Sequence, residues 1–300
     1  MLNGALAGVL STGEFLAVAG VVFVLGLGVG SFLNVVILRY GQDRVTTGRS
    51  ACPKCKRILS AGDLIPVLSF VFLLGKCRGC KLPISWQYPV VEILTGLIFV
   101  LTFLHRVTAY PITEPVELLS VGFLGSVVIL FVIWSLLIVI TVYDLYHKII
   151  PDPLVWSFVA LAGVWLVVDR YISGVDWSMA LVLDLLTGPL LFGLFYLPWR
   201  FSGGRWMGLG DAKLVLGVGL FLGFAHGFSA IILAFWIGAA VALILIGLLK
   251  ISAVYGTDKF RHVLGHISLK SEMPFGPFLV LGTLLSFFLE FDILSLSYWI

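Results

Sequence analysis

Long apolar stretches separated by short polar segments make up most of this chain. A helix needs roughly 20 consecutive, mostly apolar residues to cross the hydrocarbon core of a bilayer. Eight stretches approach that length, and they lie at about 15–38, 88–105, 117–142, 153–168, 177–198, 212–226, 227–249 and 276–297. The pattern therefore predicts an all-α polytopic membrane protein with about eight transmembrane helices. Within the first stretch, the small residues of Gly26–Ser31 predict a face on which another helix packs closely.

The composition excludes a soluble globular protein. Hydrophobic residues make up 60% of the 300 residues and charged residues only 12%, whereas soluble domains carry roughly 25% charged residues. So few charges cannot cover a water-facing surface, so the lipid bilayer is the expected environment. The formal charge of +3 is too small to indicate a nucleic-acid partner, and we expect none.

The positions of lysine and arginine predict the orientation of the chain. With eight spans, one side of the membrane carries the segment 39–87 and the loops near 143–152, 199–211 and 250–275. All 19 lysines and arginines lie on that side except Arg106 and Arg170. The positive-inside rule makes this side cytoplasmic. We therefore expect a multi-pass protein of the cytoplasmic (inner) membrane, with both termini on the outer side.

All four cysteines lie in the polar segment 39–87. They form two Cys-x-x-Cys pairs with 21 residues between them, Cys52-Pro-Lys-Cys55 and Cys77-Arg-Gly-Cys80. Two residues between thiolates let one tight turn offer both sulfur atoms to a tetrahedral ion, and two such turns complete a four-thiolate site. A reducing cytoplasm disfavours disulfides. The spacing therefore predicts a structural zinc site, against the alternatives of unrelated thiols or a redox pair.

Two aspartates are expected at the same face of the membrane. Asp144 lies at the cytoplasmic end of the third span, and Asp211 lies where the chain re-enters the membrane after the fifth. Two adjacent carboxyls can divide the work of an aspartyl protease, because one takes a proton from water while the other polarises a carbonyl. Alternatively, both are interfacial charges, with Asp211 capping the sixth span while Lys213 extends toward the interface. Spacing alone leaves both readings open.

Ordered motifs over nearly the whole chain resemble the type IV prepilin leader peptidase/N-methyltransferase family of membrane aspartyl proteases. The motifs that carry this resemblance are Gly30-Ser-Phe-Leu-Asn34, the two cysteine pairs, Ile65-Pro-Val-Leu-Ser69, Tyr88-Pro-Val-Val-Glu92, Asp144 with Ile150-Pro-Asp152, Gly208-Leu-Gly-Asp-Ala-Lys-Leu214 and Pro274-Phe-Gly-Pro-Phe278. The resemblance implies that Asp144 and Asp211 are the catalytic pair. The residues expected to support the site are Gly208, Gly210, Lys213, Pro151 and Asp152. It also implies three parts: a first transmembrane helix (1–38), a cytoplasmic zinc-binding domain (39–87) and a transmembrane aspartyl peptidase domain (88–300).

The family resemblance implies two activities. Members cut the short basic leader from type IV prepilins and pseudopilins at the cytoplasmic membrane surface. Many then methylate the new N-terminal amine with S-adenosylmethionine. Because the leader is basic, Asp152 and Glu272 are candidates for contacting it. The methyl donor's site is not apparent, since no glycine-rich nucleotide motif follows a strand; Glu92 is the candidate.

The chain departs from the family's motifs at two places, and two other functions are alternatives to a prepilin peptidase. This chain has Lys56-Arg57 where the family commonly has a histidine, and Asp63-Leu-Ile-Pro66 where it commonly has Asp-Asn-Ile-Pro; both concern the methyltransferase half. A presenilin-like intramembrane protease would share the acids but lack the cysteines. A proton-coupled transporter would show internal repeats. Asp184, inside the fifth span, is expected to make a contact between helices.

Overall fold

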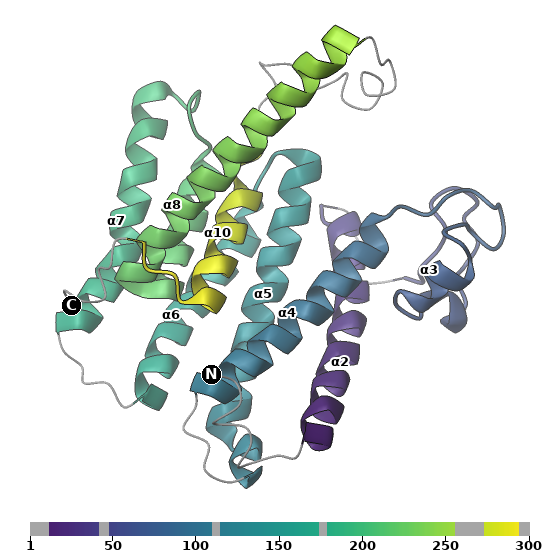
Figure 1. Ribbon diagram of the computed structural model, residues 1–300, viewed down its shortest axis with the longest axis horizontal. Helices are drawn as coiled ribbons and strands as arrows, with labels where there is room; N and C mark the ends of the chain where they lie inside the picture. The colour runs from purple at the N-terminus through teal and green to yellow at the C-terminus, as the bar shows by residue number, and fades with distance from the viewer. Residues whose placement is uncertain (1–11, 42–47, 110–114, 174–178, 256–272, 294–300) are drawn as a thin grey trace. The chain divides into compact units, whose positions relative to one another are not determined.

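The computed structural model describes residues 12–41, 48–109, 115–173, 179–255 and 273–293 (Figure 1). Within these ranges the regular structure is helical, apart from two isolated β-bridges. The helices are α2 (Thr12–Arg39), α3 (Leu68–Phe72), α4 (Gln87–Ala109), α5 (Val121–His147), α6 (Asp152–Ser173), α7 (Met179–Ser202), α8 (Leu209–Tyr255) and α10 (Gly276–Leu289), with short 3₁₀ turns η1 (Ala61–Leu64) and η2 (Pro115–Leu119). The predicted all-α fold is confirmed.

Six of the described helices are long and apolar enough to cross a membrane: α2, α4, α5, α6, α7 and α8. The shorter apolar helix α10 has 14 residues and lies within the predicted eighth span. The predicted sixth and seventh spans, 212–226 and 227–249, form one continuous run, α8. That run is interrupted at Gly223, whose φ of 71° is not helical. The boundary between the two spans therefore lies a few residues earlier than predicted.

The chain folds into two compact units. The N-terminal unit consists of Met1–Val142 and Val167–Asp176, and the C-terminal unit consists of Tyr143–Leu166 and Trp177–Ile300. The four-cysteine segment belongs to the N-terminal unit, whereas Asp144 and Asp211 both belong to the C-terminal unit. The predicted metal ligands therefore all lie in one unit, and the two predicted catalytic acids both lie in the other.

In the N-terminal unit, α2 packs against α4 through glycines. A Cβ atom on Gly26 would lie 2.6 Å from the Cα atom of Gly96, and one on Gly30 would lie 2.7 Å from the Cα atom of Glu92. At these points the two backbones approach so closely that no side chain fits between them. The close-packing face predicted at Gly26–Ser31 is thus present, and it faces α4.

The same two helices are joined by hydrogen bonds where the four-cysteine segment leaves α2 and enters α4. The Asn34 side-chain amide donates to the carbonyl of Tyr88 at 3.1 Å. Its oxygen accepts a hydrogen bond from the Gln87 side chain at 3.4 Å. Asn34 is almost fully buried, with 1% of its surface exposed. These contacts satisfy a polar group that would otherwise be costly to bury.

Arg106, one of the two basic residues on the side predicted to be external, is neutralised within the N-terminal unit. It lies on α4, is 4% exposed, and its Nη1 atom is 3.0 Å from Oδ1 of Asp169 on α6. Ionisable groups inside membrane segments usually pair in this way. Arg106 is therefore part of an interhelical ion pair, which accounts for its exception to the charge pattern.

In the C-terminal unit, Asp184 of α7 holds the interruption in α8. Its Oδ1 atom accepts a hydrogen bond from the backbone N–H of Phe224 at 2.9 Å. A Cβ atom on Gly223 would lie 2.5 Å from the same oxygen. Because the positive φ at Gly223 breaks the helix, the following N–H groups need acceptors from elsewhere. Asp184 supplies one, and so makes the interhelical contact expected of it.

Candidate active site

Asp144 lies in the last turn of α5, where the chain turns sharply toward α6. Lys148 adopts a left-handed conformation, with φ of 53°, and its N–H donates to the carbonyl of Asp144 at 2.8 Å. Ile150 and Pro151 are buried immediately after this turn, and α6 then begins at Asp152. The turn leaves the Asp144 side chain only 4% exposed.

The carboxyl group of Asp144 is held by the first residue of α10. The backbone N–H of Gly276 donates to its Oδ2 atom at 3.1 Å. A Cβ atom on Gly276 would lie 2.6 Å from that oxygen, so only glycine permits this approach. The sequence alone does not mark Gly276 as a site residue. Its one signal is the motif Pro274-Phe-Gly-Pro-Phe278, which carries part of the family resemblance.

Asp211 lies in the first turn of α8 and is half-buried. Its Oδ2 atom accepts a hydrogen bond from the backbone N–H of Gly208 at 3.3 Å, just before the helix begins at Leu209. This hydrogen bond resembles one of the two in a capping box, the one in which the acidic side chain at the third helical position accepts from the N–H of the N-cap residue. The capping role considered for Asp211 is therefore compatible with a place in the site.

The fold brings the two acids into one site around Ile150. A Cβ atom on Gly210, next to Asp211, would lie 2.9 Å from the Cβ atom of Ile150. A Cβ atom on Gly276, which contacts Asp144, would lie 3.3 Å from Cδ1 of Ile150. The site is therefore assembled from the end of α5, the start of α8 and the start of α10.

Lys213 and Asp152 form an ion pair in the C-terminal unit. The Lys213 Nζ atom is 2.7 Å from Oδ1 of Asp152, and the two side chains are 16% and 59% exposed. The pair joins the first turn of α8 to the first turn of α6. Because Asp152 is largely exposed, this pair contributes little stability by itself. Glu272, the other acid considered for contact with a leader, lies outside the described residues.

The four cysteines lie in two turns of the same design. In the first turn, the Cys52 N–H donates to the Arg57 carbonyl and the Lys56 N–H donates to the Cys52 carbonyl, both at 2.9 Å. The second turn repeats this pattern, from the Cys77 N–H to the Leu82 carbonyl and from the Lys81 N–H to the Cys77 carbonyl, again at 2.9 Å. The isolated bridges Ala51–Ile58 and Lys76–Pro83 close the two turns. We call residues 48–86 the four-cysteine module.

The four sulfur atoms fit a tetrahedral metal ion. All four lie within 4.8 Å of one another, and the Sγ atoms of Cys52 and Cys80 are 4.0 Å apart. Zn–S bonds of about 2.3 Å in a tetrahedron require sulfur atoms roughly 3.8 Å apart. Backbone N–H groups of Cys80 and Gly79 lower the pKa of the Cys77 thiol to about 6, and those of Cys55 and Lys54 lower the pKa of Cys52. The Leu82 N–H also lowers the pKa of Cys80, but burial and hydrogen bonds with the other cysteines outweigh it and raise that pKa to about 11. The turns therefore favour the metal-binding thiolate form of Cys52 and Cys77.

Glu92 connects α4 to the polar segment before it. It is buried, with 6% exposed, and its Oε2 atom accepts a hydrogen bond from the backbone N–H of Val67 at 2.7 Å. Val67 precedes α3 and has a positive φ of 60°. The carboxyl group of Glu92 thus contacts the four-cysteine module.

Membrane helices, two aspartates within one compact unit and a four-thiol module are typical of a membrane aspartyl protease, and comparisons with known proteins give the family. A model of the type IV leader peptidase family matches residues 129–243, which include Asp144 and Asp211. A model of the bacterial peptidase A24 N-terminal domain matches residues 24–106, which include all four cysteines. No solved structure matches the chain.

Three relatives of the chain carry the same name. A prepilin leader peptidase/N-methyltransferase of Pectobacterium carotovorum is 31% identical over 254 residues, covering 77% of this chain and 84% of the relative. Proteins of the same name are 35% identical in Myxococcus xanthus, covering 75% and 62%, and 29% identical in Bacillus subtilis, covering 92% and 96%. The chain belongs to the type IV leader peptidase family. It spans less than two thirds of the Myxococcus protein's length. Membership decides against the presenilin-like protease and the transporter.

Proposed function

We propose that this protein is an aspartyl endopeptidase that removes the basic leader from type IV prepilins and pseudopilins. The observation that carries the proposal is the pairing of Asp144 and Asp211 within one compact unit, each carboxyl receiving a backbone N–H from a glycine. The names of the relatives supply the substrate class. The supporting residues are Gly208, Gly210, Lys213, Pro151 and Asp152.

In the proposed mechanism the two acids have different protonation states. The ionised carboxyl takes a proton from a water molecule, which attacks the carbonyl carbon of the scissile peptide. The protonated carboxyl donates a hydrogen bond to the carbonyl oxygen and then its proton to the leaving nitrogen. The Gly276 N–H holds the Asp144 carboxyl in a fixed orientation. This orientation supports catalysis because general acids and bases act only at hydrogen-bonding distance.

The proposed site lies at the cytoplasmic surface of the inner membrane. Asp144 ends one apolar helix and Asp211 begins another, as expected for groups at the membrane boundary. The distribution of lysine and arginine supports a cytoplasmic location for this boundary. In this orientation both termini are external, although residues 1–11 and 294–300 lie outside the described residues. A pilin precursor would present its leader from the cytoplasm and its apolar helix from the bilayer.

We also propose that the four cysteines hold one structural zinc ion. Four thiolates leave no open coordination position for water, so the ion would stabilise the four-cysteine module rather than act in hydrolysis. The module would then correspond to the zinc-binding domain predicted at 39–87, between a first transmembrane helix (1–38) and the peptidase domain (88–300).

The second proposed activity is methylation of the amine that leader removal exposes. When bound, S-adenosylmethionine would supply a methyl group to the neutral amine, its C–S electron pair would stay on sulfur, and the product amine would release a proton to solvent. The names of the relatives support this activity. Two products therefore serve as readouts: the shortened pilin and its methylated form.

Replacement of each acid tests the proposal. Purified Asp144→Asn and Asp211→Asn proteins should insert into the membrane but fail to shorten a prepilin, as measured by mass spectrometry. Glu290→Gln is a matched control, because Glu290 is an exposed acid at the end of α10. It should cleave at the wild-type rate. Wild-type cleavage by either aspartate variant would refute the assignment of the pair.

A further inference from the structure

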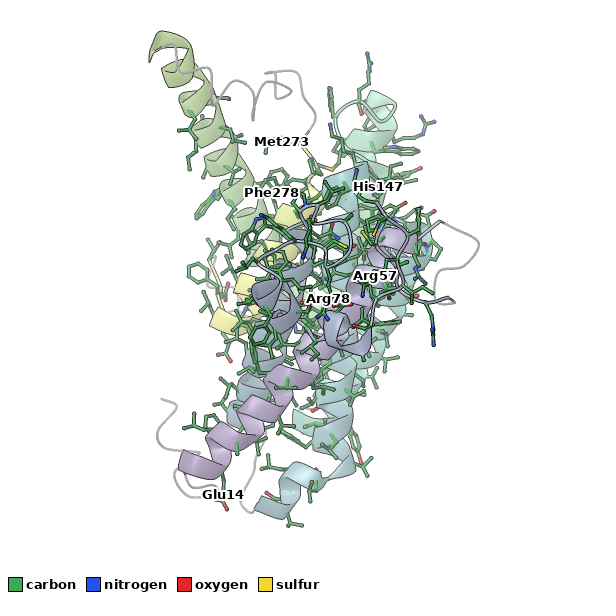
Figure 2. All side chains as sticks on the ribbon, turned by 90° about the vertical axis from the view of Figure 1, so that its right-hand side faces the viewer. Glu14, Arg57, Arg78, His147, Met273 and Phe278 are labelled. Atoms are coloured by element: carbon green, nitrogen blue, oxygen red, sulfur yellow. The ribbon has the colours of Figure 1, made fainter. Side chains whose placement is uncertain are left out.

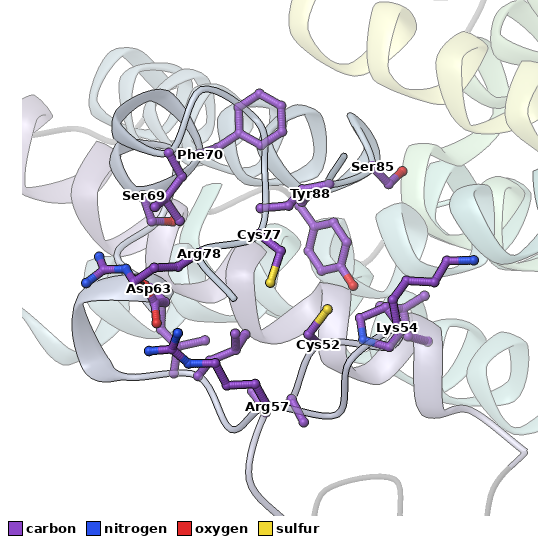
Figure 3. Close-up of a pocket in the computed structure, with 18 of the residues that line it drawn as sticks. Cys52, Lys54, Arg57, Asp63, Ser69, Phe70, Cys77, Arg78, Ser85 and Tyr88 are labelled. Atoms are coloured by element: carbon purple, nitrogen blue, oxygen red, sulfur yellow. Dashed lines mark ion pairs between the residues drawn. The ribbon is translucent and has the colours of Figure 1, made fainter. Parts of the chain in front are cut away.

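A cavity of about 580 Å³ opens in the N-terminal unit between the four-cysteine module and the adjoining ends of α2 and α4 (Figure 3). Its volume falls in the range of roughly 300–1,000 Å³ that is typical of small-molecule sites. None of the residues proposed for peptide hydrolysis lines it. The cavity therefore needs an explanation other than leader cleavage.

One wall of the cavity carries the buried carboxyl group of Glu92. Glu92 accepts hydrogen bonds from the Val67 N–H and the Ser31 side chain. Within the described ranges, none of the ion pairs includes Glu92. A buried carboxyl is costly unless it is neutralised or paired with a positive group. Glu92 therefore suits a cationic group in a ligand, whose charge would stabilise the ionised carboxylate.

Another wall carries an excess of positive charge. Arg78 pairs with Asp63, with its Nε atom 3.0 Å from Oδ1, and Arg57 lines the same cavity. On this wall the two guanidinium groups outnumber the one carboxylate. Figure 3 shows both of them on the side of Asp63, and Figure 2 shows Arg57 and Arg78 near each other, away from the end of α2 that carries Glu14. The remaining positive charge suits an anionic group such as a carboxylate, which arginine binds well.

The cavity also offers aromatic surface. Phe70 and Tyr88 both line it, and Phe70 packs against Trp86 with ring centroids 4.9 Å apart. In Figure 3 the Tyr88 ring lies across Cys52 and Cys77 from the arginines. Flat rings of this kind hold planar bases through offset stacking. The lining therefore suits a ligand that combines a cationic centre, a carboxylate and a planar base.

We propose that this cavity binds the methyl donor, a sulfonium nucleoside that carries an amino-acid carboxylate. In this assignment Glu92 faces the sulfonium, Arg57 contacts the carboxylate, and the aromatic side chains pack on the base. The assignment rests on the methyl transfer proposed above. It places donor binding in the N-terminal unit and peptide hydrolysis in the C-terminal unit, on separate sets of residues.

Binding measurements on the full chain with its metal, purified in detergent, test the role of Glu92. Affinities for S-adenosylmethionine and for S-adenosylhomocysteine, which lacks the sulfonium charge, should be measured by equilibrium dialysis. Glu92→Gln should weaken binding of the sulfonium compound at least tenfold but change that of its neutral analogue less than threefold. The glutamine oxygen can still accept the Val67 hydrogen bond, and metal content and thermal unfolding would report any folding defect. Glu290→Gln is the control and should leave both affinities unchanged. Equal weakening for both compounds, or no weakening, would overturn the assignment.

A second pair of variants tests the carboxylate contact. Arg57→Ala should weaken both compounds by a similar factor of about ten, because both carry the amino-acid carboxylate. Arg200→Ala, a change at an exposed arginine of α7, should weaken neither. Unaltered binding by Arg57→Ala would contradict the assigned orientation of the ligand.

Ultraviolet cross-linking of the radiolabelled methyl donor separates a wrong cavity from a wrong function. The label should map to peptides within 31–92. Binding by the wild-type protein with label only outside this range would overturn the cavity and leave the methyl transfer intact. A wild-type protein that binds neither compound, yet cleaves prepilin, would instead contradict the methyl transfer on which the inference rests.

Discussion

Replacement of Gly276 by alanine tests the proposed role of Asp144 without altering either acid. The alanine Cβ atom would lie 2.6 Å from Oδ2 of Asp144. The oxygen would have to move by about 0.8 Å to reach the 3.4 Å of ordinary contact, which would also weaken its hydrogen bond to the Gly276 N–H. A misplacement of about 1 Å in a catalytic group can cost roughly 100-fold in rate. We therefore expect kcat/KM for leader cleavage to fall about 30- to 100-fold, or about 2–3 kcal/mol of transition-state stabilisation.

The assay is cleavage of a purified prepilin at several substrate concentrations, with thermal unfolding of each variant measured in parallel. Gly193→Ala on α7 is the matched control, because its new methyl group would have no atom within 4 Å. The control should cleave normally, and alanine should stabilise the helix slightly. A Gly276→Ala protein that unfolds like the wild type and cleaves at the wild-type rate would refute the reasoning.

Three further predictions concern the metal site and the helix break. Purified protein should contain about one zinc ion per chain, and the double variant Cys52→Ser/Cys77→Ser should contain none by elemental analysis; metal-free wild-type protein would reject the site. Because the pKa of the Cys77 thiol is lowered to about 6, it is already ionised above that value. The logarithm of the apparent zinc affinity should therefore fall more steeply with decreasing pH below 6 than between 6 and 8 in chelator competition; an unchanged slope would contradict a low pKa. Gly223→Ala should lower the stability of the C-terminal unit by about 1–3 kcal/mol, because its new methyl group would meet Asp184 and its φ is positive. Gly163→Ala, whose new methyl group would have open space around it, should not lower the stability. Equal thermal unfolding temperatures for the two variants would contradict this account.

The features that follow from local sequence were predictable. Apolar runs of sufficient length predicted the helices, because a segment in lipid must satisfy its backbone hydrogen bonds internally. The spacing of the cysteines predicted their convergence, because each Cys-x-x-Cys pair forms its own turn. The exact break in α8 was not predictable from hydropathy, since the residues on both sides of Gly223 are apolar. Its position depends on Asp184, a partner on another helix.

The two acids could be identified from the sequence, but the residues that contact and orient them could not. Asp144 and Asp211 stood out as charges at span ends within recognisable motifs. The donation from Gly276 to Asp144, and the contact of Ile150 with both Gly210 and Gly276, join segments far apart in the chain. Glycine and isoleucine carry no chemistry that would mark them. Only the fold shows that the last helix completes the surroundings of the first acid.

The direct contact between α2 and α4 fixes both ends of the four-cysteine module independently of the module's own length. Glycines bring the two helices into contact, and Asn34 ties the exit from one to the entry of the other. With the two attachment points already fixed, lengthening or shortening the intervening chain changes the cost of loop closure only slowly. The length of the module can therefore change at little cost to the packing of α2 on α4, whereas a bulky side chain at Gly26 or Gly30 would push these two helices apart.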